Sequence, residues 1–308
     1  MWRPSILLFA FLPAILAWGA PDDRDRLPPD GAPVTRHYAS VDALQVHYRQ
    51  AGPERADSAR PVIALHQSPN SSQVFVEFLS VLGKDRRAIA PDTPGFGASD
   101  RPPTRPDITD YASTMEGFAR ALELGAVDVI GYHTGGAIAI EWARQHPERI
   151  AHLMLVGVPA FTEEERARFR EAPWPAPSPL DAAMLTREWE GSKGWQGPGQ
   201  SDRSIERTFL AKINAGQTAW WGPDAVFRYP LLERLAEVDQ PLTVIRAGDD
   251  LWEATERVRS VRPDAAYIDL PEYKFALFEI APERLANLAR SAFDTPPVPA
   301  PNASGDTP

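Results

Sequence analysis

The residues best suited to chemistry stand in three short polar segments, each of which directly follows an apolar run. The segments contain His66, Asp92 and His133. His133 lies between Gly131 and Gly135 in the third segment. An unperturbed imidazole has a pKa of about 6.5, so its neutral form can accept a proton or attack an electrophile near neutral pH. These segments therefore offer imidazoles that could act as a general base or as a nucleophile.

The elements that must position these residues alternate between strands and helices. Short apolar runs, typical of strands buried on both faces, recur at 62–65, 87–90, 127–130, 153–156, 242–245 and 266–270. A hairpin precedes them at 35–40 and 44–49. Helical spacing is found at 74–82, 115–124, 137–144 and 282–293. This alternation predicts a mostly parallel α/β sheet covered on both faces, with its chemistry in the loops at the C-terminal ends of the strands.

One interval, residues 162–239, breaks the alternation. It is rich in Trp and Pro and has helical spacing only in patches. We interpret it as a helical cap inserted into a core made of residues 34–161 and 240–294. Six Trp lie in or just after it: Trp174, Trp189, Trp195, Trp220, Trp221 and Trp252. Such aromatic density predicts an apolar pocket beneath the cap. The alternative is that these Trp form the core of the cap itself.

The N-terminus has the order of an export signal. Arg3 precedes the apolar run Ile6–Trp18, which is followed by small residues and then by charges. The run is shorter than the roughly 20 residues of a membrane-spanning helix, although an uncleaved anchor is an alternative. We expect residues 1–19 to be cleaved as a signal peptide and the protein to be periplasmic or secreted, without a membrane span after cleavage. The proline-rich residues 20–33 and 295–308 are predicted to be a flexible linker and tail.

The composition excludes several classes of protein. Asp and Glu number 42 against 32 Lys and Arg, which gives a net charge of −10, and the basic residues form no cluster. Nucleic acid is therefore not an expected partner. The chain has no Cys, which excludes disulfides, thiolate metal sites and Cys nucleophiles. The expected partner is a small molecule, and the oligomeric state is left open.

Taken in order, the segments 65–72, 90–100 and 130–137 resemble those of the α/β-hydrolase superfamily. The resemblance extends from about residue 35 to residue 293 and includes the cap. The loop Pro94–Gly97 is similar to that of the epoxide-hydrolase, dehalogenase and esterase branches. In this family the pattern Gly-x-nucleophile-x-Gly forms a sharp turn from a strand into a helix, the nucleophile elbow. The resemblance implies the α/β-hydrolase fold with a helical cap.

The chain departs from the family at the reacting residues. His133 stands where the family has Ser, Asp or Cys, and no His follows His152. Phe275 or Lys274 fills the place of the catalytic His, so the usual Ser-His-Asp triad cannot be assembled. The two flanking glycines are retained, and His is among the residues that tolerate the positive φ of an elbow. The elbow is therefore expected to survive without its usual nucleophile.

The resemblance also implies roles for the neighbours of His133. The residue after the elbow and a residue of the first loop, Thr134 and Gln67, are expected to form an oxyanion hole. His66 is expected to support that loop, and Asp250 to orient the His133 ring as a catalytic partner. The predicted substrate or oxyanion-binding residues are His66, Gln67, Tyr132, Thr134 and Trp252.

No cofactor or metal is expected, because the sequence has no close metal-ligand spacing. A metal held by His66 and His133 with Asp92 or Asp250 is the alternative.

The sequence leaves two hypotheses for the function of the protein. One is an exported α/β-hydrolase-fold enzyme that acts on a small apolar ester, lactone or related carbonyl compound through an atypical His-centred site. The other is an inactive small-molecule binding protein on the same fold. The enzyme hypothesis requires His133, Asp250 and Gln67 to converge within hydrogen-bond reach around one enclosed pocket, whereas a pocket blocked by Phe275 or by Trp of the cap favours the binding protein.

Overall fold

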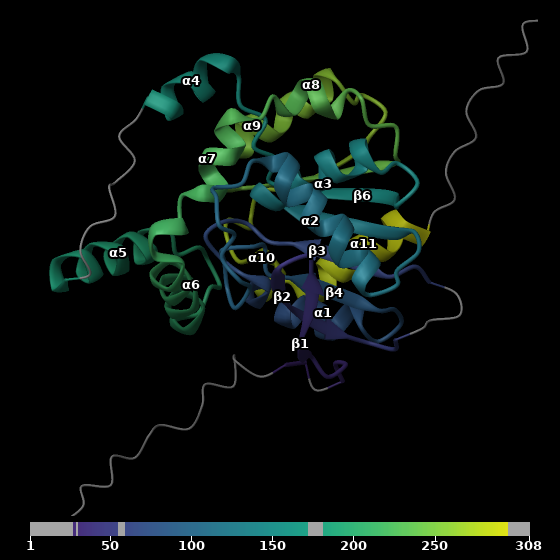
Figure 1. Ribbon diagram of the computed structural model, residues 1–308, viewed down its shortest axis with the longest axis horizontal. Helices are drawn as coiled ribbons and strands as arrows, with labels where there is room; N and C mark the ends of the chain where they lie inside the picture. Colours follow the sequence, from purple (N-terminus) through teal and green to yellow (C-terminus); the bar gives the residue numbers. More distant parts are fainter. Residues whose placement is uncertain (1–26, 29, 55–58, 172–180, 295–308) are drawn as a thin grey trace, which may run out of the picture.

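The computed structural model describes residues 27–28, 30–54, 59–171 and 181–294. The predicted signal peptide, the first part of the predicted linker and the predicted tail lie outside these residues. Figure 1 shows helices packed around a central sheet, with α5 and α6 projecting from one side.

Eight strands form one sheet in the order β1-β2-β4-β3-β5-β6-β7-β8. The strands are β1 (Thr35–Val41), β2 (Leu44–Ala51), β3 (Val62–Leu65), β4 (Ala88–Pro91), β5 (Val127–Tyr132), β6 (Ile150–Val156), β7 (Leu242–Ala247) and β8 (Ala266–Leu270). β1 and β2 form an antiparallel hairpin, and β2 also pairs antiparallel with β4. All other neighbours are parallel. The predicted mostly parallel sheet is confirmed.

Helices cover both faces of this sheet, as predicted. The helices of the core are α1 (Val76–Leu82), α2 (Ile108–Ala121), α3 (Thr134–Gln145), α9 (Trp252–Glu256), α10 (Leu277–Ile280) and α11 (Pro282–Asp294). α1, α10 and α11 pack together, and α2 packs on α3. Each group closes a separate hydrophobic core against one face of the sheet. β3, β4 and β5 are buried along their whole length, which explains why they are mostly apolar, with Asp128 in β5 as a buried exception.

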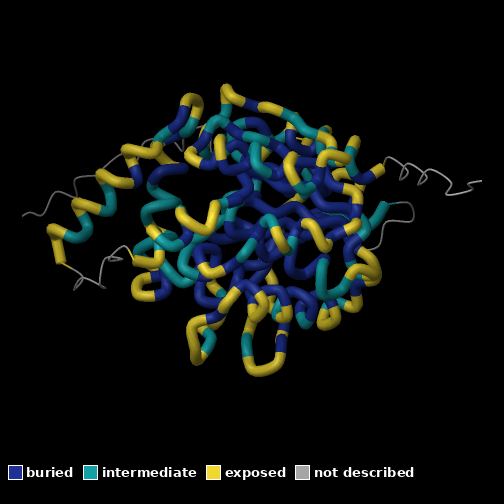
Figure 2. The backbone as a smooth tube through the Cα atoms, turned by 90° about the horizontal axis from the view of Figure 1, so that it is seen from above, coloured by how far each residue is buried: buried dark blue, intermediate teal, exposed yellow. Residues whose placement is uncertain are grey.

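The chain between β6 and β7 folds into five further helices. These are α4 (Glu163–Glu171), α5 (Ala182–Gly194), α6 (Asp202–Ala215), α7 (Trp221–Arg228) and α8 (Leu231–Leu235). α7 and α8 pack on α3, whereas α5 and α6 pack on each other. In Figure 2 the buried residues gather around the sheet, and exposed residues dominate the periphery. Among the described residues, no helix combines the length and apolar character needed to cross a membrane.

Candidate active site

His133 occupies a sharp turn between β5 and α3. Its backbone has φ 48° and ψ −113°, in the positive-φ region that most side chains avoid. The turn is fixed on both sides: the His133 amide donates to the Val156 carbonyl at 3.0 Å, and the Gly136 amide donates to the His133 carbonyl at 2.8 Å. The structure therefore has the elbow that was predicted, with imidazole at its apex.

The two flanking glycines are required by close backbone approaches. A Cβ on Gly135 would lie 2.1 Å from the Leu65 carbonyl oxygen. A Cβ on Gly131 would lie 2.6 Å from the Cα of Gly136. Neither obstacle is the end of a flexible side chain, so neither can move aside. A side chain at either position would therefore block the turn.

The imidazole of His133 is hydrogen bonded to Asp249, in the loop after β7. Nε2 of His133 lies 2.8 Å from Oδ2 of Asp249, whose side chain is completely buried. The other oxygen of Asp249 accepts the Leu251 amide at 2.9 Å. Because an ionised carboxylate only accepts hydrogen bonds, Nε2 carries a proton and Nδ1 of a neutral ring is free to accept one.

Asp250 was expected to orient this ring, but Asp249 makes the contact. Adjacent residues of the loop point their side chains in different directions: Asp249 turns inward, and Asp250 lines the pocket. Partial burial raises the pKa of the Asp250 carboxyl; His133 opposes this rise, and the neighbouring Asp249 adds to it. Asp250 therefore contributes a carboxyl group to the pocket wall beside the His133–Asp249 pair.

The expected oxyanion-hole residues lie on two segments that meet beside the elbow. Thr134 is the first residue of α3, so its amide has no acceptor within the helix and lies at the positive end of the helix dipole. The Ser68 amide contacts Oγ1 of Thr134 at 3.5 Å, which brings the loop after β3 to the same place. Gln67 lines the pocket, whereas the Thr134 side chain is buried. Thr134 can thus contribute through its backbone amide.

His66 supports the loop after β3 and does not line the pocket. Its Nδ1 lies 2.9 Å from the Gln67 carbonyl, and its Nε2 accepts the Thr93 amide at 2.9 Å. Burial lowers the pKa of this imidazole, while Asp92 opposes the change. The structure gives His66 the supporting position that was expected, so it belongs with the scaffold and not with the substrate-binding residues.

Tyr132 and Trp252 were predicted to bind substrate, but the structure places both outside the pocket. The Tyr132 ring is buried against His133 and Phe278, at centroid distances of 4.4 and 5.5 Å. Its hydroxyl has no hydrogen-bond partner within the described ranges. The Trp252 ring, at the start of α9, lies 3.9 Å from the guanidinium of Arg246. Tyr132 packs behind the elbow, because it faces the core shared with α10.

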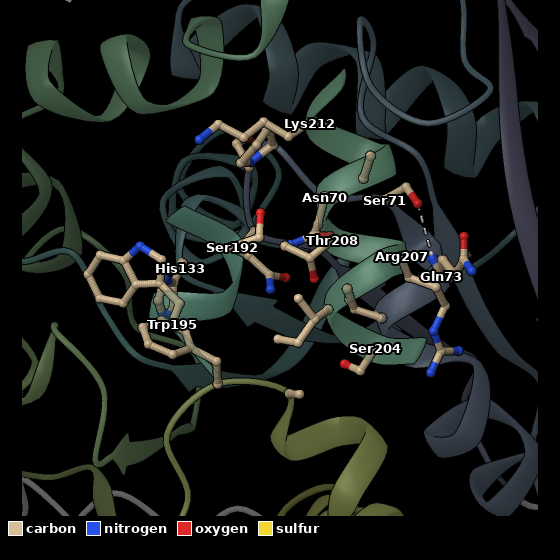
Figure 3. Close-up of a pocket in the computed structure, with 18 of the residues that line it drawn as sticks. Asn70, Ser71, Gln73, His133, Ser192, Trp195, Ser204, Arg207, Thr208 and Lys212 are labelled. Atoms are coloured by element: carbon tan, nitrogen blue, oxygen red, sulfur yellow. Dashed lines mark hydrogen bonds between the residues drawn. The ribbon is translucent and has the colours of Figure 1, made fainter. Parts of the chain in front are cut away.

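The pocket itself has a volume of about 350 Å³ and lies at the C-terminal edge of the sheet. Gln67, His133 and Asp250 line it from the loops after β3, β5 and β7. The segment between β6 and β7 closes it from the other side, mainly through α5 and α6. In Figure 3 His133 and Arg207 lie on opposite sides of the pocket. The three residues expected to converge therefore line the same pocket.

The Trp residues contribute only part of the pocket lining. Of the six Trp singled out, only Trp195 and Trp220 line the pocket in the described part of the chain, and Trp174 lies outside that part. Trp189 packs on Phe209 at 5.5 Å. Residues with hydroxyl or amide side chains also line the cavity: Ser68, Asn70, Ser71, Gln73, Ser192, Gln200, Ser204 and Thr208. The lining is therefore mixed, because Val74, Ile205 and Phe275 line it as well.

An ion-pair cluster ties α6 to the core at one side of the pocket. Nη1 of Arg207 lies 3.2 Å from Oε1 of Glu77 on α1, and Nη2 lies 3.0 Å from Oε1 of Glu279 on α10. Burial raises the pKa of the Glu77 carboxyl, and Arg207 opposes this rise. The cluster fixes α6 over the pocket.

His133, Asp249 and Asp250 are also the residues best placed to hold a cation. They offer one ligand atom each, and these atoms lie within 4.8 Å of one another. An imidazole and two carboxylates suit a divalent transition metal. The metal site considered in the sequence analysis included His66. The structure does not favour that site, because His66 is hydrogen bonded to Thr93 and does not line the pocket.

The sequence analysis missed two kinds of residue. Asp249 was passed over for its neighbour, although it is the first acid after β7. The lining residues of α5 and α6, such as Ser192, Thr208 and Lys212, were not identified. Their segment has weak apolar periodicity, so the face turned toward the pocket could not be read from it.

Comparison with known proteins places the chain among α/β hydrolases. A family model described as "alpha/beta hydrolase fold" matches residues 60–177. A haloalkane dehalogenase from Psychrobacter cryohalolentis is 34% identical over 125 residues, covering 38% of this chain and 40% of that one. A 2-hydroxy-6-oxo-2,4-heptadienoate hydrolase from Pseudomonas putida is 33% identical over 104 residues, covering 32% and 38%. The chain thus matches less than half the length of these relatives.

Solved structures share the fold over most of the chain. An esterase from Rhodococcus sp. ECU1013 superposes with a TM-score of 0.69 at 21% identity, covering 85% of this chain and 98% of that one. An aryl esterase described as putative, from Burkholderia cenocepacia, gives a TM-score of 0.69 at 16% identity, covering 85% and 100%. At these identities the likeness concerns the fold alone.

Proposed function

The chain belongs to the α/β-hydrolase superfamily, and on that basis we propose that it hydrolyses small esters, lactones or related carbonyl compounds with His133 as general base. The observation that carries the proposal is the hydrogen bond from Nε2 of His133 to the buried Asp249. It fixes the ring at the pocket and leaves Nδ1 to accept a proton. In this proposal the His133–Asp249 pair takes the place of the Ser-His-Asp triad, and His133 removes a proton from the attacking water.

The proposed reaction proceeds through one tetrahedral intermediate. A water oxygen bonds to the substrate carbonyl carbon while Nδ1 of His133 takes a proton from that water. The electron pair of the carbonyl π bond moves to oxygen, which the amides of Thr134 and Gln67 stabilise. The intermediate then breaks its bond to the leaving oxygen, which receives the proton back from Nδ1. Asp249 stabilises the imidazolium between these two proton transfers.

The pocket supports a small substrate with both apolar and polar parts. About 350 Å³ accommodates a small molecule. The aromatic rings of Trp195 and Phe275 meet edge to face at 5.2 Å, and Phe275 lies 6.2 Å from the His133 ring. These rings form an apolar wall beside the base. The hydroxyl and amide groups of the loop after β3 and of α6 suit polar substituents.

The test is a panel of activated esters and lactones assayed with the wild type and two variants. His133→Ala should lose about 10²–10⁴-fold in rate, because it removes the base. His146→Ala is the matched control: it removes an imidazole near the far end of α3, outside the pocket. Unchanged turnover in His133→Ala would exclude His133 as the base. Binding of panel compounds without any turnover would instead support the non-catalytic binding protein.

We also propose that the protein is exported. The support is the sequence order of Arg3, the apolar run Ile6–Trp18 and the small residue Gly19. N-terminal sequencing of the mature protein should begin at Ala20. A mature chain that retains Met1 and stays in the cytoplasm would contradict export without affecting the proposed hydrolase activity.

A further inference from the structure

Gly157, the residue after β6, lies directly against the His133 ring. A Cβ built on Gly157 would be 2.6 Å from Cδ2 and 2.7 Å from Nε2 of His133, and 3.0 Å from Oδ2 of Asp249. The first two distances are shorter than real Cβ contacts. The imidazole therefore occupies the volume that any side chain at position 157 would need.

The His133 ring cannot yield this volume by a small shift. Its backbone is fixed by the hydrogen bonds to Val156 and from Gly136, and the close approaches of Gly131 and Gly135 hold the turn. Tyr132 packs edge to face against the ring at 4.4 Å. A methyl group at position 157 must therefore push the ring away from Asp249.

The crowding is specific to imidazole. The two atoms of residue 133 in closest contact are distal ring atoms, which a Ser or Ala side chain lacks. Gly157 also has φ +57°, so part of the cost of any substitution comes from its backbone. The two costs are separable, because the backbone cost remains when residue 133 is Ser, whereas the contact with the ring does not.

We propose that Gly157 is a positioning residue that makes room for imidazole at the elbow and sets the hydrogen bond between His133 and Asp249. Its consequence for catalysis rests on the proposed function of His133. The structural part of the proposal does not depend on that function: beyond the preference for glycine that φ +57° gives, position 157 excludes a side chain because the His133 ring fills the space. The nearest group outside the ring is Asp249, so a side chain at 157 disturbs both partners of the pair.

The first test is a stability cycle. Gly157→Ala should decrease the folding equilibrium constant at least tenfold more in the wild-type background than in the His133→Ser background, where the backbone cost remains but the distal ring atoms are gone. Denaturant unfolding of the wild type, Gly157→Ala, His133→Ser and the double variant measures the two decreases. Gly216→Ala controls for an added methyl group at a glycine of positive φ that has nothing within 4 Å of its Cβ position. Equal decreases in the two backgrounds would overturn the proposal. If Gly157→Ala alone fails to fold, recovery of folding by added His133→Ser supports the proposal, and failure of both chains counts against it.

The second test reads the hydrogen bond itself. Spectra of ¹⁵N-labelled histidine, with the His133 signals assigned by their loss in His133→Ser, report which ring nitrogen carries the proton. Gly157→Ala should lose the hydrogen-bonded Nε2 proton signal, and Gly216→Ala should keep it. An unchanged signal in Gly157→Ala would refute the positioning role. Neither test requires turnover, so an inactive protein would contradict the proposed function and leave this inference standing.

Discussion

His133 and Asp249 are 116 residues apart in the sequence, yet their side chains are joined by a hydrogen bond of 2.8 Å. The sheet order explains the contact. β6 separates β5 from β7, and all three run parallel, so the loops that leave β5 and β7 emerge at the same edge. Gly157 follows the intervening strand and presents no side chain between the two loops.

Asp249→Asn should reduce kcat/KM by at least about tenfold more than Asp250→Asn. Asp249 supplies the charge that stabilises the imidazolium, whereas Asp250 only lines the pocket. Steady-state kinetics on any ester that the wild type hydrolyses measures the difference. Equal losses, or a larger loss in Asp250→Asn, would show that Asp250 takes part in the reaction directly.

His133→Ser should fold but remain a poor esterase, and adding Phe275→His should increase its turnover. Ser at the elbow needs a base, and the structure offers none: His66 is buried and held by Thr93 and Gln67. Phe275 lines the pocket beside the elbow, so His at this position supplies an imidazole there. Hydrolysis of p-nitrophenyl acetate by the two single variants and the double variant tests this. Efficient turnover by His133→Ser alone would mean that His66 can act as the base.

Asp92→Asn should reduce stability at neutral pH and much less in acid. Burial alone would raise the pKa of Asp92, but hydrogen bonds from His47, Ser72 and Ala98 outweigh it and hold the pKa at about 2. The unfolded chain, with an ordinary pKa of 3.8, binds the proton more readily. The ionised carboxylate thus contributes about 2 kcal/mol above pH 4, which is lost as the pH falls from about 4 to about 2. Urea unfolding at several pH values measures the difference, and a pH-independent difference would contradict it.

Zn²⁺ should inhibit the enzyme, and dialysis against EDTA should leave its activity unchanged. His133, Asp249 and Asp250 can bind the ion together, but doing so occupies the base that the reaction needs. Asp250→Asn should weaken the inhibition, because it removes one ligand. Loss of activity after EDTA, restored by Zn²⁺, would instead identify a metal-dependent hydrolase.

The central strands were predictable because they are buried on both faces. The run at 62–65 coincides with β3, and the run at 127–130 lies within β5. Helix boundaries were harder to predict than strands: α2 begins at Ile108, seven residues before the predicted helix at 115–124. Its first turn is held by a capping box between Asp107 and Asp110, polar residues that carry no hydrophobic periodicity.

The site was predictable as far as the backbone pattern determines it. The spacing of Gly131, His133 and Gly135 predicted the elbow, because glycine is needed where two backbone segments approach closely. The choice between Asp249 and Asp250 depends on side-chain directions in a loop without a repeating geometry, so the sequence could not settle it. The role of Gly157 depends on the neighbouring strand, which local spacing cannot report.

The contact between Gly157 and the imidazole restricts the order in which this site can arise by mutation. Starting from an elbow with a small nucleophile, a change to His is tolerated only where the residue after the next strand is already glycine. If His appears at the elbow while position 157 still carries a side chain, the imidazole and that side chain must occupy the same volume. Related genes with His at the elbow should therefore also encode glycine at the position of Gly157. Genes with Ser at the elbow keep only the backbone reason for glycine there, so they should also show residues that tolerate positive φ, such as Asn.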